Sequence, residues 1–113
     1  MVMNDDDVVL VLSSVPEASL AERIAHVLVE GGLAACVNVG APMVSVYAWQ
    51  GRIERTGEIP LVIKTTRARQ EEVIQALAKL HPYEVPEVLV VPVQDGLDSY
   101  LGWVRRQTQV QWH

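Results

Sequence analysis

Residues 8–32, VVLVLSSVPEASLAERIAHVLVEGG, decide the fold because they join one strand to one helix. The run 8–12 contains only valine and leucine, a continuous apolar pattern typical of a central strand buried on both faces. Pro16-Glu17 suits a first helical turn, and apolar residues then recur at helical spacing as far as Leu28. Gly31-Gly32 provides a left-handed stop. The chain therefore opens with a β-then-α unit.

Two extended runs joined by a tight turn follow this unit. Residues 34–39 form a predicted second strand, Gly40-Ala41-Pro42 breaks its pattern, and alternation resumes over 43–49. A bulge or bend within one long strand explains this break better than two separate strands. Gln50-Gly51 then predicts the turn of a β-hairpin.

The return arm of the hairpin contains a second irregularity at Thr56-Gly57 and continues as the apolar strand 59–65. Both arms are long for a chain of 113 residues. A small domain cannot cover such arms by itself, so we expect the hairpin to reach a neighbouring chain.

The last third of the chain predicts a helix, a strand and a closing helix. Helical periodicity begins at Ala68, and Pro82 stops it. Residues 88–93 form the fourth predicted strand, and Asp98 caps a short helix. The predicted inner face of that helix consists of Leu97, Leu101 and Val104.

The resulting order is β-α-β-β-α-β with a short C-terminal helix, an α+β fold of the ferredoxin-like split βαβ type. Right-handed crossovers place both main helices on one face of a four-stranded sheet, and nothing in the chain covers the other face. We therefore expect a single domain over 1–113 that forms an oligomer. The ends, 1–7 and 108–113, are predicted to be mobile.

Composition limits the function classes. The net charge is −5 and the nine lysines and arginines are scattered, which argues against nucleic acid as a partner. One cysteine, Cys36, excludes an internal disulfide and suits a reducing compartment. The start MVMNDDD lacks the basic region of a signal peptide, and no apolar run reaches the length of a membrane span. We expect a cytoplasmic protein without a membrane partner.

The segment 81–93, HPYEVPEVLVVPV, is the best candidate for a functional site. Its prolines hold the segment extended and out of any helix. A rigid arm of this kind can present His81, Tyr83, Glu84 and Glu87 at fixed positions.

Three segments together carry a family resemblance: GGLAACVNV at 31–39, YAWQGRIERTGEIPLVIKTT at 47–66, and HPYEVPEVLVVPV at 81–93. In this order and spacing they resemble the CutA family of divalent-cation tolerance proteins, over about residues 8–106. The resemblance implies a ferredoxin-like sandwich assembled as a homotrimer, with extended hairpins that pair between subunits, as in the architecture of PII-type signalling proteins. It also implies binding of divalent metal ions, chiefly copper.

The resemblance places His81 at the family's motif histidine. Some members carry a further histidine where this chain has Leu80, and a cysteine where it has Ser13. Those differences remove two good ligands for a soft or borderline metal, so a copper or zinc site here should be weak. Two roles for His81 stay open: a metal ligand, or a hydrogen-bonded residue that orders the proline arm.

Each of the other candidate residues has two possible roles. Cys36 is either a small core residue or a ligand or reactive thiol. Lys64 either lines a pocket for an anionic ligand or pairs with a carboxylate such as Glu87. Most of the aromatic residues suit subunit packing, or alternatively a small-molecule cleft between subunits. That cleft would be lined by Tyr47, Trp49, Lys64, Tyr83 and Trp103.

Catalysis has little support, because the sequence contains no phosphate-binding glycine loop and no nucleophile elbow. The first functional hypothesis is a non-enzymatic homotrimer that binds divalent cations weakly and contributes to metal tolerance. The alternative is a PII-like trimeric sensor or scaffold that binds a small anionic ligand or a partner protein in its intersubunit cleft.

Overall fold

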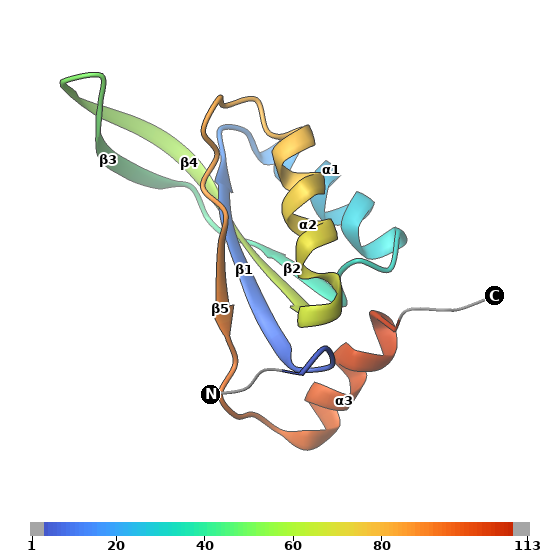
Figure 1. The fold of residues 1–113 in the computed structure, drawn as a ribbon. Coiled ribbons are helices and arrows are strands. Elements are labelled where there is room, and N and C mark those ends of the chain that lie inside the picture. Colours follow the sequence, from blue (N-terminus) through green and yellow to red (C-terminus); the bar gives the residue numbers. More distant parts are fainter. Residues whose placement is uncertain (1–3, 110–113) are drawn as a thin grey trace.

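The computed structural model describes residues 4–109, which form one α+β unit (Figure 1). Its strands and helices follow the predicted order of elements. They are β1 (Val8–Val15), α1 (Ala18–Glu30), β2 (Cys36–Val39), β3 (Met43–Trp49), β4 (Arg52–Thr66), α2 (Arg67–Leu80), β5 (Leu89–Pro92) and α3 (Asp98–Gln107).

The sheet has the strand order β2-β4-β1-β5, and all neighbouring strands are antiparallel. Strand β3 pairs with the first half of β4 and projects with it beyond the sheet as a hairpin. Helices α1 and α2 lie side by side against one face of the sheet (Figure 1). This arrangement confirms the predicted antiparallel topology with two helices on one face.

The hydrophobic core lies between the sheet and these two helices. Alternate residues of β1 and β4, such as Val11 and Ile63, point toward the helices and are completely buried. They meet Ile24 and Leu28 of α1 and Leu77 of α2, which are also completely buried. The apolar periodicity of both helices therefore matches the face that they present to the sheet.

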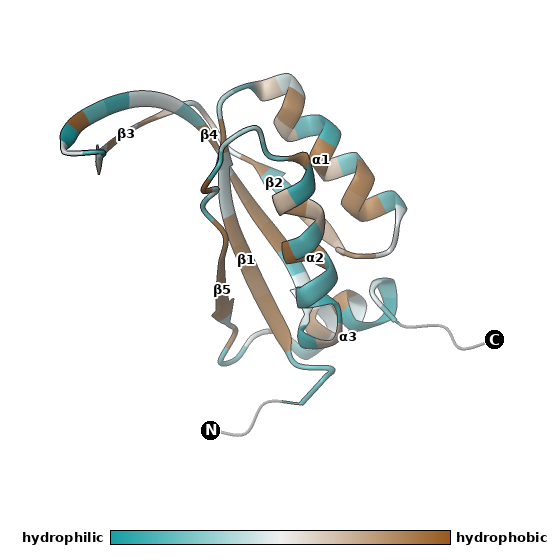
Figure 2. Cartoon of the chain, turned by 45° about the horizontal axis from the view of Figure 1, so that its top comes forward, coloured by the Kyte–Doolittle hydropathy of each residue, from teal (hydrophilic) through white to brown (hydrophobic). Residues whose placement is uncertain are grey.

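The opposite face of the sheet, here called the open face, has cover only at one end. There α3 packs its buried Val104 against Val8 and Ala35. Figure 2 shows that hydrophobic residues continue along β1 and β5, where the chain provides no second layer. The apolar side chains left half-buried or exposed on this face are Leu10, Leu12, Val62, Leu89 and Val91.

Strands β2 and β3 behave as one long strand with a bulge, as predicted. Val39 pairs with Leu61 and Met43 pairs with Glu58, so the three residues 40–42 face only the two residues 59–60. Gly40 lies at this bulge, where its backbone N–H donates to the carbonyl of Pro60 over 2.9 Å. The predicted irregularity at Thr56-Gly57 is wrong, because both residues pair regularly with β3.

The hairpin turn is confirmed at Gln50-Gly51. Both residues have positive φ, 50° and 78°, which is the signature of a type I′ turn. Trp49 and Arg52 close the turn as a directly opposed pair. The backbone twist of this turn type matches that of the two long arms.

Helix α3 differs from its prediction at the N-terminus. Asp98 lies in the first turn, and the N-cap is Leu97. Leu97 is 73% exposed, so it does not belong to the inner face. The buried position Val104 and the partly buried Leu101 were predicted correctly.

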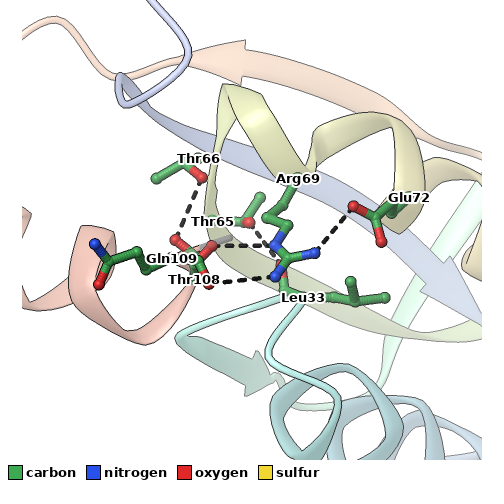
Figure 3. A network of polar contacts seen from close by, with 7 residues as sticks. All are labelled: Leu33, Thr65, Thr66, Arg69, Glu72, Thr108 and Gln109. Carbon is green, nitrogen blue, oxygen red and sulfur yellow. Dashed lines mark hydrogen bonds and ion pairs between the residues drawn. The ribbon is translucent and has the colours of Figure 1, made fainter. Parts of the chain in front are cut away.

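The C-terminal end of α3 is fixed to the start of α2 by a polar network (Figure 3). Arg69 donates from Nε to the carbonyl of Thr108 over 3.0 Å and from Nη2 to that of Gln109 over 3.3 Å. Thr108 is buried and lies 3.3 Å from Thr66, hydroxyl to hydroxyl. Thr108 is therefore hydrogen-bonded at the end of α3, and residues 110–113 of the predicted mobile tail lie outside the described part.

The N-terminal segment is also held at its backbone. The carbonyl of Asp5 accepts a bond from the Ala68 N–H, and that of Asp7 accepts one from the Arg67 N–H. The Arg105 guanidinium donates to the carbonyl of Asp6 over 2.9 Å. These bonds join the backbone of residues 5–7 to α2 and α3, and the mobility predicted for residues 1–7 stays a prediction.

The bulge generates a prediction about Gly40. A Cβ at this position would lie 2.6 Å from Cγ of the Pro60 ring, whereas a Cβ at Gly57 would have no atom within 4 Å. We expect Gly40→Ala to lower the free energy of unfolding by about 1–3 kcal/mol, because the overlap forces a backbone shift. Gly57→Ala is the matched control and should leave stability unchanged or raised. Chemical denaturation measures both, and equal effects of the two substitutions would contradict the bulge geometry.

Candidate functional site

The proline arm, residues 81–88, crosses from the end of α2 to the start of β5. His81 is the C-cap of α2 with extended backbone angles, φ −76° and ψ 135°. The following Pro82 favours this conformation, because its ring disfavours helical angles in the preceding residue. The arm then runs beside the end of β1 and the base of the hairpin.

The His81 side chain is 7% exposed, and both of its ring nitrogens are used. Its Nε2 lies 2.6 Å from the carbonyl oxygen of Ser14, and its Nδ1 lies 3.1 Å from the backbone nitrogen of Tyr83. A carbonyl can only accept and a backbone N–H can only donate, so the proton sits on Nε2. The ring therefore orders the arm, and it could ligate a metal only by giving up one of these bonds.

The far end of the arm is tied to the same strand. Ser13 of β1 donates from its hydroxyl to the backbone carbonyl of Glu87 over 2.8 Å. Ser14 donates to Oε2 of Glu58 over 3.0 Å, and both of these residues are buried. Two neighbouring serines at the end of β1 thus fix both the arm and a buried carboxylate.

Two adjoining pockets lie between the arm and the hairpin, and we call them together the aromatic pocket. Tyr47, Trp49, Tyr83 and Glu84 line the first, of ≈ 350 Å³, with Pro82 and Val85. The second, of ≈ 400 Å³, shares three of these residues with the first. Its lining consists of Ser14, Ser45, Val46, Tyr47, Glu58, Tyr83, Val85 and Glu87.

Five of the predicted candidates therefore come together: Tyr47, Trp49, Tyr83, Glu84 and Glu87. Sequence reasoning missed Ser14 and Glu58. The strand alternation of β4 was the available signal for Glu58, because it places this carboxylate on the open face with Val62 and Lys64.

The other candidates lie elsewhere within the chain. Lys64 is six residues from Glu58 along β4, about 20 Å at the usual strand rise. Its Nζ lies 5.7 Å from the ring centroid of Tyr100, which in turn contacts the ring of Trp103. Cys36 pairs with Lys64 in the sheet and is half-buried. One chain therefore does not form the predicted cleft that combined Trp49 and Tyr83 with Lys64 and Trp103.

Metal ligands do not converge within one chain. Over residues 4–109, no group of three or more His, Cys, Asp or Glu side chains could hold a metal ion. His26 is exposed on α1, 3.3 Å from Glu30. The terminal His113 lies outside the described residues.

The phenol of Tyr83 has a pKa that its surroundings shift. Burial raises the pKa of the Tyr83 phenol above its ordinary value, and the nearby Glu58 carboxylate and Tyr47 raise it further. Tyr47 is fixed by a hydrogen bond of 2.9 Å between its hydroxyl and that of Thr56. The pocket therefore disfavours additional negative charge.

None of the helices within residues 4–109 is long and apolar enough to cross a membrane.

Comparison with known proteins gives a consistent result. Residues 9–107 match the family described as CutA1 divalent ion tolerance protein. The divalent-cation tolerance protein CutA of Thermus thermophilus is 40% identical over 99 residues, covering 88% of this chain and 96% of the relative.

Two solved structures show the same fold. The crystal structure of CutA from Xylella fastidiosa has a TM-score of 0.89 at 45% identity, covering 91% of this chain and 99% of that one. The periplasmic divalent cation tolerance protein CutA from Archaeoglobus fulgidus has a TM-score of 0.87 at 32% identity, covering 90% and 99%.

The raised pKa of Tyr83 generates a prediction. Because unfolding releases the phenol to its lower, ordinary pKa, stability should be intact below about pH 10 and fall as the pH rises toward the folded-state value. Glu58→Gln removes one cause of the shift, so the ultraviolet titration of Tyr83 should move to lower pH. Tyr83→Phe identifies the signal by difference. An unmoved titration in Glu58→Gln would show that the carboxylate does not act on this phenol.

Proposed function

This chain belongs to the CutA1 divalent ion tolerance family, and we propose that it works as a homotrimer that binds divalent cations, copper foremost, weakly. The Thermus relative is named for tolerance of divalent cations and not for a reaction, and we propose a non-catalytic role. The observation that carries the proposal is the open face of the sheet, which residues 4–109 cover only at the end where α3 packs.

Two features support self-association. The open face presents apolar side chains from β1, β4 and β5. Burying this face against another chain would remove these side chains from water and stabilise the assembly. The hairpin carries further apolar residues on one side, namely Val44, Val46 and Ile53. All three are exposed. A ring of identical copies would bury both surfaces, and the family resemblance suggests three copies.

Cation binding would then depend on the assembly. One chain offers no set of three ligands over its described residues, so an ion would take ligands from more than one chain. His81 is engaged by Ser14 and Tyr83, whereas the exposed Glu84 and Glu87 are free to ligate. Carboxylates alone bind copper or zinc less firmly than imidazole or thiolate ligands, which is why we propose weak binding.

A second candidate is a trimeric sensor or scaffold that takes a small molecule in the aromatic pocket. The pocket itself favours this candidate, because three aromatic rings together with Pro82, Glu84 and Val85 line a concave surface. The anionic ligand predicted from the sequence requires Lys64 in the same intersubunit cleft, and a neighbouring chain would have to supply that lysine. Within one chain Lys64 lies beside Tyr100.

The compartment stays a prediction. We propose the cytoplasm, because the single Cys36 suits a reducing environment. The name of the Archaeoglobus relative gives a periplasmic location for that protein.

Calorimetric titration with Cu²⁺ and Zn²⁺ tests the metal proposal. We expect weak binding to the wild type, and a loss of at least fivefold in affinity in the double variant Glu84→Gln/Glu87→Gln. His81→Gln should keep the affinity but lower the free energy of unfolding by about 1 kcal/mol, because one hydrogen bond of the ring is lost.

His26→Gln, at an exposed histidine of α1, is the matched control and should change neither quantity. Negligible heats from the wild type with both ions would end the metal proposal. A selective loss of affinity in His81→Gln would instead assign the ion to the imidazole.

A further inference from the structure

Glu58 is a buried carboxylate without a cationic partner. The residue is 8% exposed, and its hydrogen-bond donor is the neutral hydroxyl of Ser14. None of the ion pairs among residues 4–109 includes Glu58. Removing a carboxylate from water is unfavourable unless a positive charge accompanies it. A cation that bound beside this carboxylate would therefore be stabilised.

The surroundings of Glu58 specify what kind of cation would fit. Glu58 lines the same pocket as Tyr47 and Tyr83, and the adjoining pocket adds Trp49 and Glu84. With Glu87, three acidic residues line the two pockets, and no lysine, arginine or histidine is among their lining residues. An anion would be repelled from such a pocket.

Within one chain a divalent metal ion fits the pocket less well, and the ion proposed above for Glu84 and Glu87 would need further ligands from a neighbouring chain. Such an ion needs several lone-pair donors at close range, and the chain brings no three candidate ligands together over residues 4–109. Aromatic faces instead attract alkylammonium groups, whose charge is spread over methyl or methylene groups. Within one chain Tyr47 and Trp49 are 39% and 41% exposed, so a ligand held between subunits could contact their rings.

We propose that the aromatic pocket binds an organic cation, a small alkylammonium compound whose charged group sits between Glu58 and the rings of Tyr47 and Tyr83. The proposal rests on the second function proposed above and specifies its ligand class. The cation supplies the missing counter-charge of Glu58, and Trp49 contributes a further ring at the mouth of the pocket.

The same ammonium chemistry could come from a lysine of a neighbouring copy. Lys64 is half-buried on the open face, and none of the ion pairs among residues 4–109 includes it. The open pocket of ≈ 350 Å³ beside exposed rings favours a free ligand over a side chain. The substitution Lys64→Gln separates a free ligand from a lysine of a neighbouring copy.

Calorimetry and amide chemical shifts should be measured with choline and with its uncharged carbon isostere 3,3-dimethylbutanol. We expect choline to bind at least tenfold more tightly than the isostere and to shift amides of the hairpin and the arm. Glu58→Gln keeps an acceptor for Ser14 and should lower the affinity for choline at least tenfold. Trp49→Leu should lower that affinity several-fold.

Glu22→Gln, an exposed position of α1, is the control for loss of one negative charge and should leave choline binding unchanged. Unfolding midpoints confirm that each variant is folded. Equal affinities for choline and the isostere would overturn the proposal, as would choline binding that does not depend on Glu58.

Two further measurements, with butyrate and with Lys64→Gln, distinguish failure of the ligand class from failure of the sensor function. Binding of butyrate, but not choline, in the same pocket would overturn the ligand class and leave the sensor function standing. If choline binds only after Lys64→Gln, a neighbouring copy's lysine supplies the ammonium group and the free-ligand proposal fails. If neither choline, the isostere nor butyrate shifts the pocket amides, in the wild type or in Lys64→Gln, both the ligand class and the sensor function fail.

Discussion

Side chains alternate across β1 and β4, and β1 is largely apolar on both faces, whereas on the open face of β4 Val62 lies between Glu58 and Lys64. Helices α1 and α2 cover one face completely, as the buried Val11 and Ile63 show. Helix α3 covers only one end of the other face. The rest of the structure depends on this unequal cover of the two faces. Apolar residues of the open face stay partly exposed, and the hairpin extends beyond the sheet with exposed apolar residues of its own.

The candidate site lies where the open face meets the hairpin. Its geometry depends on the end of β1, because Ser13 and Ser14 hold the proline arm at Glu87 and at His81. The same strand end therefore supports the sheet, the arm and the buried Glu58.

Local patterns were sufficient to predict most of the fold. The turn at Gln50-Gly51 and the bulge near Gly40 follow from backbone preferences of a few neighbouring residues. Thr56-Gly57 was misjudged because regular pairing with β3 overrides the weak strand propensity of glycine. The site was harder to predict, because its groups meet only in three dimensions. His81 bonds to Ser14, 67 residues earlier in the chain, while Lys64 and Glu58 share a strand but lie far apart.

The mass of the protein in solution tests the central claim most directly. Light scattering at micromolar concentration should give three times the chain mass of 12.5 kDa, because identical copies bury the open face. A stable mass of 12.5 kDa, with the apolar residues of β1 and β5 exposed to water, would contradict the account.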